Sequence, residues 1–426
     1  MNKKRIAVIG AGISGLTCAY NLQKAGFEVV VFEKNATVGG RMQSREKDGF
    51  LFDIGANHLV PLYTHMRKYV QQFGLEWYAF DDFGYGIFKD DEVKKPFDVI
   101  SRMTKLKLFS SSLSGRKTSF DDFMFPVQIS EYDTEDGDSY LRKKIGEEAT
   151  NYLGDGFVSA YQFYGLKEVS KAFVLAGIES IQHDNKDWSL HLTRGGMSAL
   201  PNAFAKELDV RLNTEVKQVE AKDDEVKIDG ELFDAAVLAS TASASKQMFK
   251  NPTQAQQELL DSISYASSMV VAFQFSVEHC TDETLVWTPK IESPMIASYS
   301  LEHTKGEAVI QNGKTLLLAF LHDKAARDLM NKTDEEIYVE VKKELLRVAP
   351  SIQNSDWLDP HDLQRWEEAM PTYPQGSIQH MKEFLDMHQG EQHVWLCGDY
   401  MSSPWTEGAL RCGERVAEAI SLKIKE

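Results

Sequence analysis

The first 33 residues of the chain place a strand, a glycine-rich turn, a helix and a second strand in close succession. Residues 5–9 (R-I-A-V-I) are almost entirely apolar, as in a strand buried on both faces of a parallel sheet. Residues 14–25 carry apolar side chains at helical spacing, and Gly26 stands where a helix can end with positive φ. Residues 28–32 (E-V-V-V-F) are β-branched and predict the second strand. This β-α-β unit predicts a Rossmann-like domain of the α/β class.

The turn between the first strand and the helix has the pattern G-x-G-x-x-G at residues 10–15. The first glycine permits a tight turn, the second lets backbone approach a pyrophosphate, and the third lets helix and strand pack closely. Phosphates bound there meet unpaired N–H groups at the positive end of the helix dipole. We therefore expect a dinucleotide cofactor to be bound by Gly10, Gly12, Ser14 and Gly15.

An acidic residue ends the second strand. Glu33 lies 18 residues after Gly15 and is placed to accept hydrogen bonds from ribose hydroxyl groups. A carboxylate here repels a 2′-phosphate, which argues against NADP at this site.

Composition excludes several classes of protein. A chain of 426 residues is long enough for about two to three domains. Its content of 42% hydrophobic and 26% charged residues is ordinary for globular proteins and excludes a disordered, collagen-like or coiled-coil protein. The net charge of -17 repels phosphate backbones, so we expect no nucleic-acid partner. The 4 cysteines and 11 histidines show no metal-ligand spacing, which predicts no metal site and free thiols in a reducing cytoplasm.

The N-terminal segment is similar to a secretory signal, because Lys3-Lys4-Arg5 precede an apolar stretch at residues 6–20. Three glycines interrupt that stretch, so we expect the segment to be retained in a cytoplasmic protein. No other segment approaches the roughly 18 apolar residues that a membrane span needs. Residues 101–120 are basic and free of acids, and an acidic loop follows. Such a stretch can lie on a membrane, but a solvated helical face is the interpretation we favour.

Further apolar runs predict the remaining framework. Helices are expected at residues 333–348 and 408–424. Strands are expected at residues 208–212, 215–221, 234–239, 265–275, 315–321 and 394–397, with a hairpin partner at 225–233.

Two motifs follow Glu33, namely V-G-G-R at residues 38–41 and F-D-I-G-A-N at residues 52–57. Together with the dinucleotide turn they resemble the flavin-containing amine oxidase superfamily, which includes monoamine oxidases, protoporphyrinogen oxidases and phytoene desaturases. The resemblance implies FAD, with its pyrophosphate contacted by Gly40 and Arg41. It also implies that the flavin ring passes beside Gly55, Ala56 and Asn57.

Two later segments extend the resemblance along the whole chain. Residues 195–197 (G-G-M) with 213–216 (N-T-E-V) are similar to the middle FAD segment of the family, where the backbone of Val216 would touch the adenine. Residues 395–399 (W-L-C-G-D) and 405–410 (W-T-E-G-A-L) are similar to its C-terminal segment. There the resemblance places the ribityl and phosphate groups at Gly398 and Asp399. It places the flavin N1–C2=O edge at the start of a helix, where a positive dipole stabilises negative charge, beside Gly408 and Ala409.

Residues 365–374 (R-W-E-E-A-M-P-T-Y-P) resemble the protoporphyrinogen oxidase-like branch. By the same resemblance, Tyr373 and Trp405 fall near the two positions of the monoamine oxidase aromatic cage, which favours a partly cationic amine.

The sequence departs from the family pattern at two places. Thr372 stands where a flavin-linking cysteine would be, so we expect non-covalent FAD. Residues 267–275 contain no lysine to face the flavin, which favours the protoporphyrinogen oxidase or desaturase branch.

We therefore expect a Rossmann-like FAD-binding domain interleaved with an α+β substrate-binding domain. The FAD-binding domain would comprise residues 1–75, 192–250 and 385–426, and the substrate-binding domain residues 76–191 and 251–384. The resemblance implies an FAD-dependent oxidoreductase that removes a hydride equivalent from a CH–NH or CH–CH unit of a small organic substrate. The electrons would pass to dioxygen or another acceptor. Amine oxidation and C–C desaturation are rival reactions, and a non-catalytic FAD-binding protein is the alternative from another class.

Overall fold

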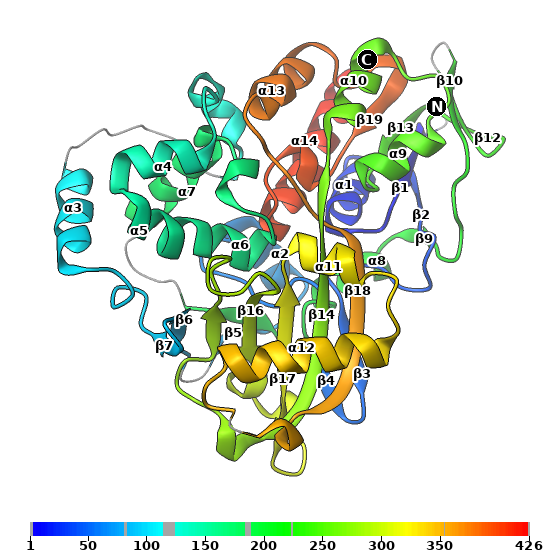
Figure 1. The fold of residues 1–426 in the computed structure, drawn as a ribbon. Coiled ribbons are helices and arrows are strands. Elements are labelled where there is room, and N and C mark those ends of the chain that lie inside the picture. Colours follow the sequence, from blue (N-terminus) through cyan, green and yellow to red (C-terminus); the bar gives the residue numbers. More distant parts are fainter. Residues whose placement is uncertain are drawn as a thin grey trace.

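A computed structural model describes residues 3–80, 83–113, 124–183, 189–222, 225–352 and 354–424. Five strands form an all-parallel sheet in the order β19-β13-β1-β2-β9 (Figure 1). Their bounds are β1 (Arg5–Ile9), β2 (Glu28–Phe32), β9 (Asp209–Arg211), β13 (Ala235–Leu238) and β19 (Val394–Leu396). The expected α/β class with a Rossmann-like parallel sheet is confirmed.

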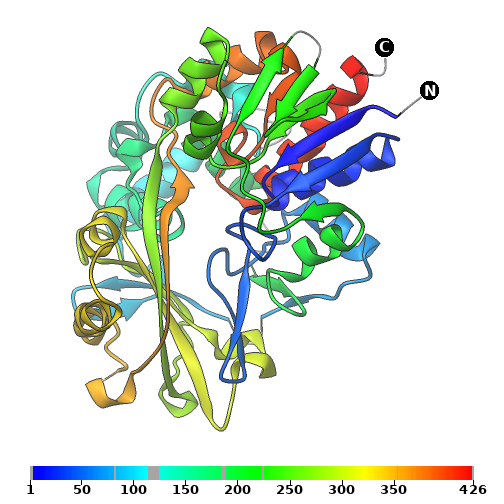
Figure 2. The same ribbon diagram turned by 90° about the vertical axis from the view of Figure 1, so that its right-hand side faces the viewer.

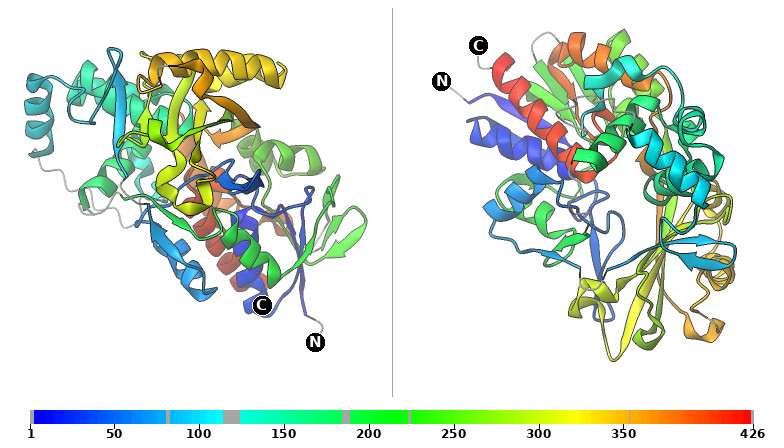
Figure 3. Two further views of the ribbon diagram at one scale, coloured as in Figure 1. Left: turned by 90° about the horizontal axis from the view of Figure 1, so that it is seen from below. Right: turned by 90° about the vertical axis from the view of Figure 1, so that its left-hand side faces the viewer.

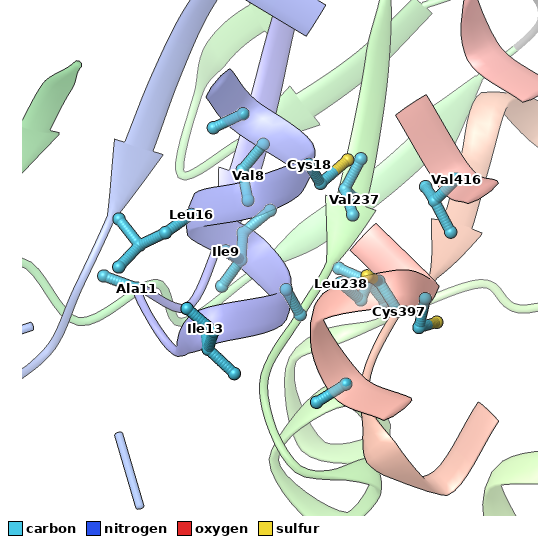
Figure 4. Packing of buried hydrophobic residues seen from close by; sticks show 14 of the residues in the cluster. Val8, Ile9, Ala11, Ile13, Leu16, Cys18, Val237, Leu238, Cys397 and Val416 are labelled. Atoms are coloured by element: carbon cyan, nitrogen blue, oxygen red, sulfur yellow. The ribbon is translucent and has the colours of Figure 1, made fainter. Parts of the chain in front are cut away.

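Two helices from opposite ends of the chain cover one face of this sheet. They are α1 (Ile13–Lys24) and α14 (Thr406–Ile424), and α14 starts two residues earlier than its pattern predicts. Figure 4 shows apolar side chains of β1, α1, β13 and α14 packed together, among them Val8, Leu16, Val237 and Val416. All four are buried. Each buried side chain of this size contributes about 1.5–3 kcal/mol, so this contact anchors both chain ends to the sheet.

A second sheet has seven strands in the order β18-β14-β17-β16-β15-β6-β7. Its two longest strands, β14 and β18, run side by side and antiparallel from the level of the parallel sheet to the opposite end of the molecule (Figures 1 and 2). One face is covered by α12 (Asp334–Val348), whose buried residues recur at helical spacing at Ile337, Val341, Leu345 and Val348. The bounds are β6 (Tyr85–Lys89), β7 (Glu92–Lys94), β14 (Tyr265–Ser276), β15 (Leu285–Trp287), β16 (Ile296–Leu301), β17 (Lys314–Leu321) and β18 (Asp359–Pro371).

A group of helices stands beside both sheets (Figure 3). It consists of α3 (Arg102–Leu113), α4 (Gly137–Ile145), α5 (Glu147–Ala149), the π-helix η2 (Thr150–Asp155), α6 (Gly156–Gln162) and α7 (Lys171–His183). The first part of the basic stretch forms α3, and residues 114–123 lie outside the described residues. Among the described residues, no helix is both long and apolar enough to span a lipid bilayer.

Smaller elements complete the fold. The helices are α2 (Thr64–Gln72), α8 (Ala199–Lys206), α9 (Ala242–Met248), α10 (Gln254–Ser262), α11 (Asp323–Leu329) and α13 (Ser377–Met387). The short strands are β3 (Ser44–Lys47), β4 (Phe50–Asp53), β5 (Trp77–Ala79), β8 (His191–Thr193), β10 (Val219–Lys222), β11 (Glu225–Ile228) and β12 (Glu231–Phe233). They form the pairs β3-β4 and β5-β8 and the three-stranded sheet β10-β11-β12.

The structure corrects two predicted strands. Residues 215–218 are not a strand, because the backbone just before them bonds to the segment after β2: Thr214 N–H donates to the Glu33 carbonyl and Asn213 N–H to the Asn35 carbonyl. Residues 225–233 form two strands, β11 and β12, because residues 229 and 230 adopt positive φ and turn the chain between them. The domain boundaries stay a prediction.

Candidate active site

A cavity of about 980 Å³ lies between the two sheets. On one side it is lined by residues that end the parallel strands, including Ile9, Phe32 and Ala239. On the other side it is lined by residues of the seven-stranded sheet, including Ser268 on β14 and Trp366 on β18. The carboxyl ends of parallel strands are the usual ligand-binding edge of such sheets. Nearly all the predicted site residues line this cavity.

The glycine turn forms one wall of the cavity. Gly10 has φ +107°, and a Cβ there would lie 2.7 Å from the Ala239 carbonyl oxygen. Gly12 is the N-cap of α1 and supplies no side-chain cap, so the first N–H groups of the helix, near Ser14, are left for a ligand. Gly15 does not line the cavity. A Cβ at this position would lie 2.1 Å from the Gly10 carbonyl oxygen, so the lack of a side chain lets α1 pack against the turn.

Glu33 is buried at the end of β2 and lines the cavity. One carboxylate oxygen accepts the Ala11 N–H at 2.9 Å, and the other accepts the Asn35 N–H at 2.9 Å and its Nδ2 at 2.7 Å. The backbone bonds from Thr214 bring the loop with Val216 to the same end of the cavity. This end of the cavity therefore brings together the Glu33 carboxylate and the loop of Val216. The resemblance implies that these two groups bind the ribose and the adenine of an adenosine.

Arg41 and Asp399 form an ion pair in the cavity wall, next to Gly40 and Gly398. The guanidinium donates to both carboxylate oxygens, with Nη1 2.7 Å from Oδ2 and Nη2 2.9 Å from Oδ1. Burial by itself lowers the pKa of Arg41, but the Asp399 carboxylate outweighs it and the net shift is upward. The guanidinium stays charged beside the helix start, where an anionic pyrophosphate is expected.

The far end of the cavity is aromatic. It is reached past Gly55, Ala56 and Asn57, and Trp405 lies there with Tyr161 of α6, their ring centroids 6.1 Å apart at 63°. We call this part the ring end; its aromatic wall is made of Tyr63, Tyr161, Phe163, Phe320, Trp366 and Trp405.

The chain takes a strained conformation where it forms the ring end. Phe163, directly after α6, has φ +69°, which is rare for a bulky residue. The π-helical turn η2 precedes α6 on the same helical path. Strained backbone and π-helical turns concentrate at functional sites.

Tyr373 does not line the cavity, which contradicts its predicted place in an aromatic cage. It is 2% exposed, it stacks on Phe173 with centroids 5.4 Å apart, and its hydroxyl donates to the Asp399 carbonyl at 2.6 Å. Burial raises the pKa of this hydroxyl. The reason lies in the backbone: its carbonyl accepts the Ser170 N–H and its N–H donates to the Glu168 carbonyl, which holds the side chain against α7. Tyr373 thus supports Asp399 from behind.

Gly408 also does not line the cavity, whereas Ala409 does. A Cβ on Gly408 would lie 2.1 Å from Ser403 Oγ, so this glycine serves the tight turn that starts α14. Glu407 ties the start of α14 to the start of α2, because its carboxylate accepts the His65 and Met66 N–H groups at 2.9 and 2.8 Å. Burial raises the pKa of Glu407. The start of α14 is thereby held at the cavity.

Sequence reasoning missed three ring-end residues. In residues 365–374 sequence reasoning selected Tyr373, whereas the segment places Trp366 on the cavity wall. Consecutive residues 366–370 all line the cavity, so the two-residue period of the strand did not distinguish Trp366. His58 directly follows the recognised D-I-G-A-N stretch. Nothing local distinguished Tyr161. Within the described residues, no group of three or more metal-ligating side chains occurs.

Residues 13–421 match the family model of flavin-containing amine oxidoreductases. The chain belongs to this family. Among curated proteins, this chain is 22% identical over 467 residues to the L-amino-acid oxidase of Sistrurus catenatus edwardsii, covering 99% of this chain and 87% of that protein.

Solved structures show the same fold. A putative protoporphyrinogen oxidase from Exiguobacterium sp. 255-15 superposes with a TM-score of 0.78 at 16% identity, covering 99% of this chain and 100% of that one. Wild-type putrescine oxidase bound to putrescine gives 0.76 at 17% identity, covering 98% and 99%. Membership of the flavin-containing amine oxidoreductase family makes the protein a flavin-dependent oxidoreductase of amines or related substrates. The family assignment supports an enzyme over the non-catalytic alternative.

Proposed function

We propose that the enzyme binds FAD non-covalently along the whole cavity and oxidises a CH–NH unit of a small organic substrate at the ring end. The observation that carries this proposal is the order of groups along the wall. A fixed carboxylate at Glu33 is followed by a helix start with Arg41, and then by an uncharged aromatic end beside Asn57 and Trp405. These groups suit the adenosine, the pyrophosphate and the flavin ring of FAD, in that order along the wall.

The residues present fit this cofactor. Gly12 leaves the start of α1 uncapped, Gly10 has the positive φ that the turn needs, and Glu33 holds its carboxylate with three donors from the chain itself. Non-covalent binding is supported because no cysteine is among the described residues that line the cavity. Bound FAD supplies a two-electron acceptor.

The two proposed domains follow the two sheets. Residues 1–75, 192–250 and 385–426 hold all five strands of the parallel sheet, and residues 76–191 and 251–384 hold all seven strands of the other sheet.

The chain contributes orientation, exclusion of water and electrostatics. Trp405 and Tyr161 form adjoining faces against which a substrate can stack beside the flavin. The start of α14, held by Glu407, directs a positive dipole end towards the cavity and stabilises negative charge that develops there.

Dehydrogenation of a CH–CH unit is the second candidate, and one observation favours it. Ser268 and Val270 of β14 line the cavity, and this strand carries no lysine. By resemblance, many amine oxidases place a lysine on this strand to face the flavin, so its absence favours the CH–CH reaction.

The test is anaerobic mixing of the flavin-loaded enzyme with primary amines, secondary amines and cyclic CH–CH substrates, following flavin absorbance near its oxidised maximum. We expect amines to bleach the flavin. Bleaching by CH–CH substrates alone would replace amine oxidation by the second candidate. Hydrogen peroxide released after readmission of air would identify dioxygen as the acceptor.

We also propose a cytoplasmic location. Its support is the state of the four cysteines, all of which are free thiols. Fractionation of cells with antibody detection tests this, and recovery outside the cytoplasm would refute it.

A further inference from the structure

His58 is a polar side chain on the aromatic ring end whose hydrogen-bonding capacity is half used. The residue lines the cavity, and its Nδ1 lies 2.7 Å from Asn57 Oδ1. An amide oxygen can only accept, so Nδ1 must carry the hydrogen. In a neutral imidazole the other nitrogen, Nε2, is then a bare acceptor. Nε2 makes no hydrogen bond within the described part of the chain.

The surroundings of His58 keep its ring neutral. Burial, and then the positive charge of Lys305, lower the pKa of His58 to about 3. Lys305 is itself buried behind the cavity wall, with Nζ 2.7 Å from a Glu302 carboxylate oxygen and 3.7 Å from Asp53 Oδ2. The ring therefore presents an acceptor, not a cation, near neutral pH.

No lysine or arginine among the described residues lines the ring end to pair with a substrate carboxylate, and Lys305 behind the wall is already paired with Glu302. Among the described residues that line the cavity, the lysines and arginines are Lys34, Arg41 and Lys217. Lys34 follows Glu33 and Lys217 follows Val216 at the adenosine end, and Arg41 is paired with Asp399. A carboxylate carried into the ring end would lose its hydration among aromatic side chains without a counter-charge.

We propose that the ring end takes an amine with apolar carbon substituents and no carboxylate, and that the amine N–H donates to Nε2 of His58. The aromatic wall accepts the apolar part, and His58 fixes the nitrogen and hence the adjacent carbon. His58 is thus a positioning residue that sets specificity. This inference rests on the proposed function and names its substrate class.

The first test uses ligand pairs that differ only by a carboxylate, 2-phenylethylamine against L-phenylalanine and isopentylamine against L-leucine. Binding is read from the perturbed absorbance of oxidised flavin, and turnover separately from its bleaching. We expect each amine to bind about a hundredfold or more tighter than its amino acid. Comparable binding of the amino acids, or no binding of the amines, overturns the inference. Amines that bind tightly without bleaching the flavin refute amine oxidation but leave this selectivity established.

The second test changes the acceptor. His58→Leu removes it, and His58→Gln keeps an amide acceptor near the place of Nε2. We expect His58→Leu to weaken binding of 2-phenylethylamine about three- to tenfold and His58→Gln to restore most of it. The control is His388→Leu, the same change at a histidine that pairs with Glu391 outside the cavity lining. Wild-type affinity in His58→Leu, or equal loss in both His58 variants, contradicts the role of Nε2. Because the ligand pairs are compared on the wild-type enzyme, the first test remains decisive even if a His58 variant fails to fold.

Discussion

Glu33→Gln separates the structural role of this carboxylate from its role in holding the cofactor. The carboxylate accepts three chain donors, the Ala11 N–H and two from Asn35. A glutamine has one acceptor oxygen, so either the Ala11 N–H or the Asn35 donors must face an NH₂ group. A buried donor without an acceptor costs about 1–3 kcal/mol, and the free energy of unfolding of the apoprotein should fall by that amount.

The same change should weaken FAD binding. Charge-assisted hydrogen bonds from ribose hydroxyls are worth about 1.5–3 kcal/mol, so the Kd should rise about tenfold to a hundredfold. Urea unfolding of apoprotein gives the first quantity, and quenching of FAD fluorescence on titration gives the second. Glu28→Gln is the matched control, because Glu28 begins the same strand but pairs with Arg5 at the surface, its side chain 54% exposed. If Glu33→Gln binds FAD as tightly as Glu28→Gln, the ribose assignment is refuted, whatever happens to stability.

Four further results are expected. Acid precipitation should release intact FAD into the supernatant, and flavin left on the pellet would disprove non-covalent binding. Trp405→Ala should keep the flavin but slow its reduction by about tenfold or more, since the substrate loses an aromatic face beside Tyr161 against which it stacks. Normal reduction with a lowered melting temperature would assign Trp405 to the core. Gly15→Ala should lose about 1–3 kcal/mol in urea unfolding, because its Cβ would meet the Gly10 carbonyl oxygen at 2.1 Å; an unchanged midpoint would refute that clash. Burial lowers the pKa of His322 to about 4, so as the pH falls the unfolded chain binds a proton at this histidine before the folded chain does. The free energy of unfolding should therefore decrease between about pH 6.5 and 4, by up to about 1.4 kcal/mol per pH unit. In His322→Leu the free energy of unfolding should decrease less steeply over this range.

Much of the cavity wall beside β1 and β2 could be predicted because its residues belong to one local unit. Gly10, Gly12, Ser14 and Glu33 lie on consecutive elements within 24 residues, and the hydrogen bonding of a β-α-β unit brings them together whatever the rest of the chain does. Val216 lines the cavity, although the strand predicted to contain it is absent at that point. Its loop is drawn there by backbone bonds to the segment after β2, which no periodicity reveals.

The sequence by itself determined the parallel sheet, the glycine turn and the acid that follows it, because strand and helix periods and glycine positions encode contacts within one unit. Only the tertiary structure decided which residues form the ring end of the cavity. The pairing of β18 with β14 shifts register between Ala266 and Ser268, so that Ser268 lies opposite Trp366 and both face the cavity. Past the end of β18, backbone bonds hold Tyr373 against α7 instead. Which residues of two strands lie opposite each other depends on pairing between segments about 100 residues apart, which local patterns do not encode.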